Sequence, residues 1–143
     1  MIIIDASVFV KLFKQEEGSE QARALIDRLV EDGTPLLAPT IVLYETLSAA
    51  LHVGYPFARI HDLFDRLNAL GLTIDQPDEN ELVLAEKIAT GAAPGGGYPT
   101  LFDSIYHAMA INRTGTFVTA DSRHVAKAGH LGAVMLLADW RSA

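Results

Sequence analysis

The chain has 143 residues, of which half are hydrophobic and a fifth are charged, a profile typical of one globular domain covering residues 1–143. A net charge of −7 argues against nonspecific nucleic-acid binding through a broad basic face, although it leaves a nucleic-acid substrate open. The absence of cysteine excludes disulfides, thiolate zinc sites and cysteine nucleophiles. No secretory signal and no apolar run of membrane-spanning length is visible, so we expect a cytoplasmic protein without a membrane partner.

Short apolar runs alternate with segments of helical spacing along the chain. We predict strands, in order, at residues 2–4, 36–38, 72–74, 116–119 and 134–137. We predict helices at residues 7–14, 19–30, 40–52, 56–70, 78–90, 101–112 and 122–128, with Thr40 and Asp78 as N-caps of the third and fifth. The Gly/Pro-rich stretch 91–100 indicates a surface loop rather than a phosphate cradle, because no strand leads into it and no Lys-Ser/Thr follows it.

Strands that alternate with helices imply a parallel sheet flanked by helices. The sequence therefore predicts an α/β fold whose central parallel sheet has four to five short strands and is flanked by about seven helices. In such sheets the functional groups collect beyond the carboxyl ends of the strands.

Four acidic residues stand where apolar elements would otherwise continue. Asp5 and Asp121 each end a predicted strand, Asp103 lies in the first turn of a helix, and Glu45 interrupts the apolar helix at 40–52. A carboxylate in apolar surroundings is costly unless a partner or a cation compensates its charge. Because Asp5, Asp103 and Asp121 point to one sheet edge and Glu45 can reach it from the long helix, we expect a shared cation site.

Each acid also has an ordinary structural interpretation. Asp5 and Asp121 each follow a strand and precede a helix, as N-caps do. Asp103 can simply favour the positive end of its helix. Glu45 is harder to explain in this way, because its neighbours one turn away are small or apolar: Ile41, Val42, Ser48 and Ala49.

The ordered set of these motifs is more specific than any one of them. It comprises Ile4-Asp5-Ala6-Ser7, Tyr44-Glu45, the run from Phe102-Asp103-Ser104 to Ala110, and Phe117-Val118-Thr119-Ala120-Asp121. In order and spacing, over essentially the whole chain, it resembles the PIN-domain family and, within it, the VapC-type toxin ribonucleases of type II toxin–antitoxin systems. One departure is His107, where many relatives carry a smaller or apolar residue.

This resemblance implies a three-layer PIN-like fold and an Mg²⁺-dependent endoribonuclease that hydrolyses RNA phosphodiester bonds. Oxygen donors without cysteine or paired histidines suit Mg²⁺ or Mn²⁺ better than zinc. Asp5 and Asp103 are the expected direct metal ligands. Glu45 would complete the cation site or orient the attacking water, and Asp121 would hold a second metal or act through a bound water.

Other side chains are assigned supporting roles. Ser7 and Thr119 are expected to hydrogen-bond the carboxylates and orient them. Basic residues near the proposed edge are Lys11, Lys14, Arg123 and Lys127. Of these we assign substrate binding to Arg123 and Lys11. The five histidines show no metal-ligand spacing, so we expect structural or surface roles for them.

The helices at 40–52 and 56–70 carry more apolar surface than one core needs, which fits self-association and a groove for a partner helix. The resemblance implies a homodimer and a cognate antitoxin that covers the active site, and the acidic chain would complement a basic partner.

Three other functions remain open from the residues. One is a PIN nuclease that serves RNA processing without a toxin role. Another is an acid-pocket phosphatase or phosphoacceptor domain with Asp5 as nucleophile, although Ser7 stands where a haloacid-dehalogenase-type phosphatase carries a second aspartate. The last is a non-catalytic module that binds RNA or protein.

Overall fold

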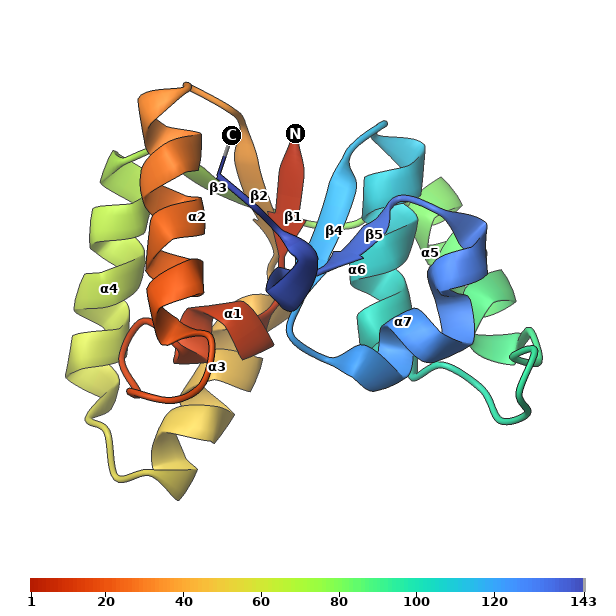
Figure 1. The fold of residues 1–143 in the computed structure, drawn as a ribbon, viewed down its shortest axis with the longest axis horizontal. Coiled ribbons are helices and arrows are strands. Elements are labelled where there is room, and N and C mark those ends of the chain that lie inside the picture. The colour runs from red at the N-terminus through yellow and green to blue at the C-terminus, as the bar shows by residue number, and fades with distance from the viewer. Residues whose placement is uncertain (143) are drawn as a thin grey trace.

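The computed structural model describes residues 1–142 and shows one central sheet with helices on both sides (Figure 1). The strands are β1 (Ile2–Ile4), β2 (Leu36–Pro39), β3 (Leu72–Asp75), β4 (Thr116–Thr119) and β5 (Val134–Leu136). All neighbouring strands are parallel, in the order β3-β2-β1-β4-β5.

Seven α-helices accompany the strands within the described residues. They are α1 (Ala6–Val10), α2 (Ser19–Glu31), α3 (Ile41–His52), α4 (Phe57–Ala69), α5 (Glu79–Thr90), α6 (Leu101–Asn112) and α7 (Ser122–Ala128). Two short 3₁₀ turns, η1 (Gly129–Leu131) and η2 (Leu137–Asp139), flank β5. The prediction of an α/β fold with a parallel sheet of four to five strands and about seven helices is confirmed.

Some predicted boundaries are wrong. The first helix does not run from 7 to 14, because it ends at Val10. Residues Lys11 to Phe13 continue in tight turns, in which each amide donates to the carbonyl oxygen three residues earlier. The Lys11 ammonium bonds Glu16, which holds the chain in this turn. The last strand ends at Leu136, because Leu137 already begins η2.

The two predicted N-caps behave differently. Asp78 accepts the amide of Glu81 at 2.8 Å while the Glu81 carboxylate accepts the amide of Asp78 at 2.8 Å, which forms a capping box on α5. The prediction that Thr40 caps α3 is wrong in detail, because its backbone is already helical and its hydroxyl makes no capping bond. The helix α3 is therefore held by packing rather than by a cap.

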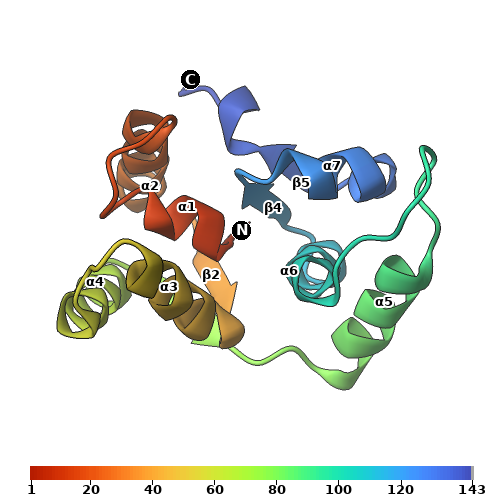
Figure 2. The same ribbon diagram turned by 90° about the horizontal axis from the view of Figure 1, so that it is seen from below.

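The helices divide into two groups around the sheet. Seen from below in Figure 2, α1 to α4 lie on one side and α5 to α7 on the other, with the strands between them. The apolar core is formed by both groups against the sheet; fully buried members include Ile3, Ile4, Phe9, Tyr106 and Phe117. Burial of such side chains is the dominant stabilisation of the fold.

The register of the two central strands brings distant residues together. Ile4 of β1 pairs with Val118 of β4 in a parallel ladder. Asp5, directly after β1, and Thr119, the last residue of β4, therefore lie beside each other at the carboxyl edge of the sheet.

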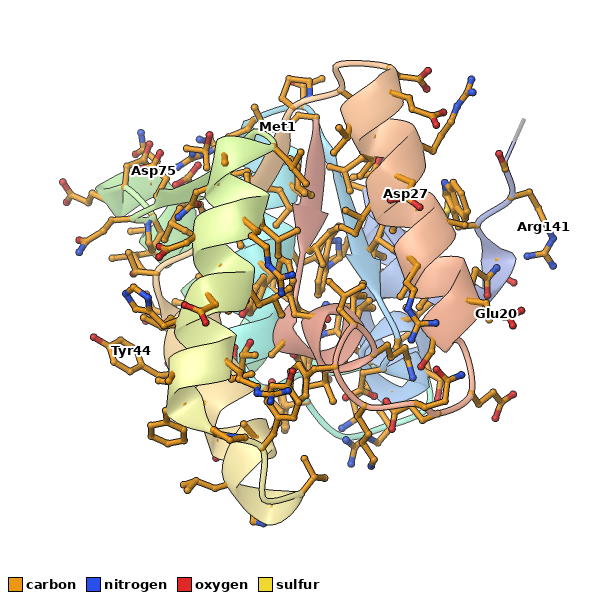
Figure 3. All side chains as sticks on the ribbon, turned by 90° about the vertical axis from the view of Figure 1, so that its left-hand side faces the viewer. Met1, Glu20, Asp27, Tyr44, Asp75 and Arg141 are labelled. Atoms are coloured by element: carbon orange, nitrogen blue, oxygen red, sulfur yellow. The ribbon has the colours of Figure 1, made fainter. Side chains whose placement is uncertain are left out.

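Several large apolar side chains of α3, α4 and the residues that directly follow each helix remain exposed: Tyr44, Leu51, Val53, Phe57 and Leu70. Figure 3 shows Tyr44 pointing away from the body of the protein. This surface is the apolar excess that the sequence predicted for these two helices. Within residues 1–142, every helix is too short or too polar to cross a lipid bilayer.

Candidate functional site

Asp5 is the most deeply buried of the four candidate acids, with 4% of its surface exposed. It directly follows β1 and is the N-cap of α1, where its Oδ1 accepts the amide of Val8 at 3.4 Å. The Ser7 hydroxyl donates to the same oxygen, and the Thr119 hydroxyl donates to Oδ2 at 2.6 Å. The cap interpretation of Asp5 is therefore correct, and it accounts for only part of what surrounds the carboxylate.

The two hydroxyls are oriented by the backbone. Ser7 Oγ accepts the amide of Ala120 at 2.9 Å, and Thr119 Oγ1 accepts the amide of Asp121 at 3.0 Å. Each hydroxyl thus accepts a hydrogen bond from a backbone amide and donates one to Asp5. Ser7 and Thr119 therefore both lie beside the Asp5 carboxylate and hydrogen-bond it.

Burial raises the pKa of Asp5 to about 7, although the hydrogen bonds from Ser7 and Thr119 act in the opposite direction. The negative charge of Asp103 contributes to this rise. Asp5 is therefore a carboxylate whose charge is poorly compensated by the protein alone, which is the situation that a bound cation relieves.

Asp103 lies in the first turn of α6, half-buried, and bonds Thr100, the cap of that helix, whose hydroxyl donates to Asp103 Oδ2 at 2.9 Å. Burial raises the pKa of Asp103, the Thr100 bond lowers it, and the charge of Asp121 raises it. The cations of Arg123 and Lys127 act to lower it. The net direction of the shift is upward, chiefly because burial disfavours the charged form.

Glu45 reaches the site from α3 and is half-buried. The Tyr106 hydroxyl donates to Glu45 Oε1 at 2.7 Å across 61 residues of sequence. Burial raises the pKa of Glu45, the Tyr106 bond lowers it, and the charge of Asp103 raises it. The carboxylate thus has a fixed orientation and a charge that the protein leaves partly uncompensated.

Asp121 differs from the other three acids because it already has a cationic partner. It caps α7 by accepting the amide of Arg123 at 2.9 Å, and the Arg123 guanidinium contacts both carboxylate oxygens at 3.2 and 3.1 Å. Burial alone would raise the pKa of Asp121, but the Arg123 contacts outweigh it and hold the pKa below its usual value.

Three pairs among the four acids lie close enough for the charge of one to shift the pKa of the other. The charge of Asp103 acts on Asp5 and on Glu45, and the charge of Asp121 acts on Asp103. A bound divalent cation would offset the repulsion among these carboxylates. An all-oxygen set of this kind fits Mg²⁺ or Mn²⁺.

A second group of possible metal ligands lies on α4, a helix that carries none of these four acids. Among the described residues, His61, Asp62 and Asp65 of α4 are the only three metal-binding side chains whose ligand atoms all lie within 4.8 Å of one another. All three are exposed, and His61 pairs with Asp65 at 3.2 Å one helical turn away. Exposed pairs with this spacing are common on helix surfaces without any metal.

The two predicted substrate-binding cations are both engaged by protein groups. The Lys11 ammonium donates to Glu16 Oε1 at 3.1 Å and to the Glu17 carbonyl at 2.7 Å. Arg123 is 83% exposed and lies against Asp121. Arg123 is therefore beside the acids, whereas Lys11 is held in the loop that precedes α2.

Two contacts of the site are not among the sequence predictions. The sequence pattern places Tyr106 in an apolar helix, yet its hydroxyl fixes Glu45. The pattern places Thr100 at the end of a loop, yet it caps α6 and bonds Asp103. A signal for Thr100 is present, because a threonine three residues before an acid at a helix start is typical of an N-cap.

Solved structures share this fold. The chain matches a chain of FitAcB from Neisseria gonorrhoeae with a TM-score of 0.68 at 20% identity, covering 98% of this chain and 100% of that one. It matches VapC20 of Mycobacterium tuberculosis, described as a sarcin-ricin loop cleaving toxin, with a TM-score of 0.67 at 17% identity over 94% and 97% of the two chains. VapBC2 from Rickettsia felis, solved with a DNA fragment from its promoter, matches with a TM-score of 0.69 at 15% identity over 95% and 97%.

No curated protein matches the chain with significant similarity. The family described as PIN domain, however, matches residues 2–130, which include all four acids and every strand before β5. The chain therefore belongs to the PIN-domain family.

Proposed function

We propose that this protein is an Mg²⁺- or Mn²⁺-dependent endoribonuclease that hydrolyses RNA phosphodiester bonds and acts as the toxin of a toxin–antitoxin pair. The observation that carries the proposal is the buried Asp5 carboxylate, oriented by Ser7 and Thr119 and facing the charge of Asp103. Such a carboxylate is expensive to maintain unless it binds a cation.

In this proposal Asp5 and Asp103 hold the cation, and Glu45 completes its coordination or orients the attacking water. A bound divalent ion would lower the pKa of that water and neutralise charge on the phosphoryl oxygens. Tyr106 keeps Glu45 in place, because its hydroxyl at 2.7 Å leaves the carboxylate one favoured orientation.

Asp121 and Arg123 are proposed to separate when substrate and cation bind, so that Asp121 contacts the cation and Arg123 contacts the RNA. Both Asp121 oxygens are occupied by the Arg123 guanidinium. If Asp121 turns toward a cation, the guanidinium is released at the edge of the site and can bind a phosphate of the RNA. Lys11 is a weaker candidate for this role, because its ammonium already has two acceptors.

The proposed partners are an RNA substrate, a cognate antitoxin and a second copy of the chain. Support comes from the apolar side chains exposed on α3, α4 and the residues that directly follow each helix. It comes also from the similarity to VapBC2 and FitAcB, and from the description of VapC20 as a toxin that cleaves the sarcin-ricin loop. The net charge of −7 suits a basic partner.

The test is cleavage of structured RNA by purified protein that has been freed of any bound partner. We expect cuts in Mg²⁺ or Mn²⁺ that disappear with EDTA and in Asp5→Asn. The matched control is Asp62→Asn, which removes an acid from the exposed group on α4 and should leave cleavage unchanged. Cleavage that persists in Asp5→Asn, or that is lost in Asp62→Asn, contradicts the proposed site.

A toxin role and an RNA-processing role are separated by a growth assay. Expression of the wild-type chain in a bacterial host should arrest growth, and Asp103→Asn should abolish the arrest. Normal growth with an active wild-type enzyme would favour RNA processing.

A further inference from the structure

Two buried histidines connect the helices that carry Asp103 and Asp121. His107 lies on α6 four residues after Asp103, and His124 lies on α7 three residues after Asp121. Neither exposes more than 2% of its surface, and His107 Nδ1 lies 3.0 Å from His124 Nε2. Each helix thus presents an acid at its start and a histidine one turn later, and the two histidines are bonded to each other.

The proton positions in this pair follow from its outer contact. His107 Nε2 lies 2.6 Å from the carbonyl oxygen of Gly132, which can only accept, so Nε2 carries the proton. The Nδ1 of this neutral ring is then unprotonated and accepts a hydrogen bond from the N–H at His124 Nε2. The Nδ1 of His124 is left as a buried lone pair without a donor among the described residues.

The hydrogen bonds run in one direction through three elements: from α7 to α6, and from α6 to Gly132 in the turn before β5. Both imidazoles also pack on Phe117 of β4, with ring centroids 5.6 Å away for His124 and 6.3 Å for His107. Helices α6 and α7 lie beside each other in both Figure 1 and Figure 2. The pair therefore ties α7 to the sheet and to the helix that bears Asp103.

Simple core filling explains this arrangement poorly. An apolar side chain would fill the space without an uncompensated nitrogen, whereas the pair leaves His124 Nδ1 buried and unbonded among the residues that the structure describes. What a buried polar bond supplies and an apolar contact does not is a defined direction and length. The bond here fixes the first turn of α7, and with it the cap residue Asp121, relative to α6.

We propose that the His107–His124 hydrogen bond is the positioning contact that sets the spacing between Asp103 and Asp121 for cation binding. The histidines touch no reacting atoms and act only through the two acids. This inference rests on the proposed function, because it requires Asp121 to contribute to the cation site.

The test is a double-mutant cycle on Mn²⁺ affinity, measured by isothermal titration calorimetry without RNA. The four proteins are the wild type, His124→Leu, Asp121→Asn and the double variant. In the wild-type background, His124→Leu should weaken Mn²⁺ binding about 10-fold, the lower end of effects seen when a ligand loses its supporting contact. In the Asp121→Asn background the same substitution should have no further effect, because the acid through which it acts is gone.

Three further variants make the cycle decisive. His124→Gln keeps an N–H donor near the position of Nε2 and should restore most of the affinity. His124→Phe keeps the ring on Phe117 without the bond and replaces His124→Leu if that variant does not fold. Val125→Ala is the control for a packing change on α7 and should leave Mn²⁺ affinity unchanged.

An equal loss of affinity in both backgrounds, or no loss in either, overturns the positioning role. So does a Gln variant as weak as the Leu variant. Failure of the proposed function gives a different result: Asp5→Asn would then bind Mn²⁺ as tightly as the wild type.

Discussion

The Thr119 hydroxyl donates a hydrogen bond of 2.6 Å to Asp5 Oδ2, and Thr119 Oγ1 accepts a hydrogen bond from the amide of Asp121. One hydroxyl thus joins the ends of β1 and β4, through the carboxylate of Asp5 and the backbone amide of Asp121. Because the lone pair toward Asp121 is used by an N–H, the hydroxyl proton is directed at Asp5.

Thr119→Val removes this hydroxyl at nearly constant volume. We expect a loss of stability of about 1–3 kcal/mol, since a buried carboxylate and a backbone amide each lose a partner. Mn²⁺ affinity should fall about 10-fold, because Asp5 is no longer held in one orientation. Thr116→Val makes the same chemical change at the start of β4 and is the control; equal Mn²⁺ affinities in the two variants would contradict the role given to Thr119.

The stability of the metal-free protein should depend on pH through Asp5. Burial raises the pKa of Asp5 from 3.8 to about 7, so between these values the folded state binds the proton and the unfolded state does not. The stabilisation that this provides is complete below the unfolded pKa and is lost as pH rises through the folded pKa. Ionised Asp5 therefore destabilises the fold above about pH 7 in the absence of a cation.

Asp5→Asn removes this effect, so in EDTA the variant and the wild type should be equally stable near pH 4. Near pH 8 the variant should be more stable by up to about 4 kcal/mol, or on the order of 10 °C in Tm. Burial lowers the pKa of His124 to about 4, which gives an opposite trend, but it is present in both proteins and cancels in the difference. Thermal denaturation of both proteins at the two pH values measures this. If the stability difference between them is the same at both pH values, the buried charge of Asp5 is already compensated by the protein.

Much of the fold follows from local sequence. Apolar runs bounded by turn residues give all five strands, and the alternation with helices gives the parallel sheet. Once the strands are parallel, Asp5 and Asp121 must lie at the same edge, because each follows the carboxyl end of a strand directly or within two residues. Residue pattern and strand direction are therefore enough to predict this part of the site.

The contacts between distant residues do not follow in this way. Tyr106 meets Glu45 across 61 residues and His107 meets His124 across 17, and both contacts depend on how α6 packs rather than on its own sequence. Glu81 has the pattern of one more solvated acid of α5, yet it is 1% exposed because Arg113 folds onto it. Local patterns specify elements, while packing specifies which polar groups become buried partners.

Tyr106→Phe separates orientation of Glu45 from packing. The Tyr106 ring is fully buried and stacks on Phe117 at a centroid distance of 5.5 Å, so the variant keeps its packing and loses only the hydrogen bond. We expect a stability loss of about 1 kcal/mol and a fall of about 10-fold in the single-turnover cleavage rate. Tyr55→Phe is the matched control, and a rate equal to that of the wild type in Tyr106→Phe would mean that Glu45 needs no orientation.

Glu81 provides the opposite case, a buried acid with no place in the proposed site. Its carboxylate takes Arg113 Nε at 2.6 Å and Nη2 at 3.0 Å, and these contacts hold its pKa below the usual value in spite of burial. Glu81→Gln should destabilise the fold by about 1–3 kcal/mol, because Arg113 loses one of its two charged partners and keeps only Asp75, at 2.8 Å. Mn²⁺ affinity should stay within a factor of about two of the wild type; a large drop in affinity would show that any buried acid affects the site.

The central claim is that carboxylates from distant parts of the chain gather around a divalent cation at the edge of the sheet. A crystal structure with Mn²⁺, read by anomalous diffraction, tests it most directly. We predict a manganese peak in contact with Asp5 and Asp103. Manganese found only at His61, Asp62 and Asp65 of α4, with Asp5 and Asp103 still apart, would contradict the account.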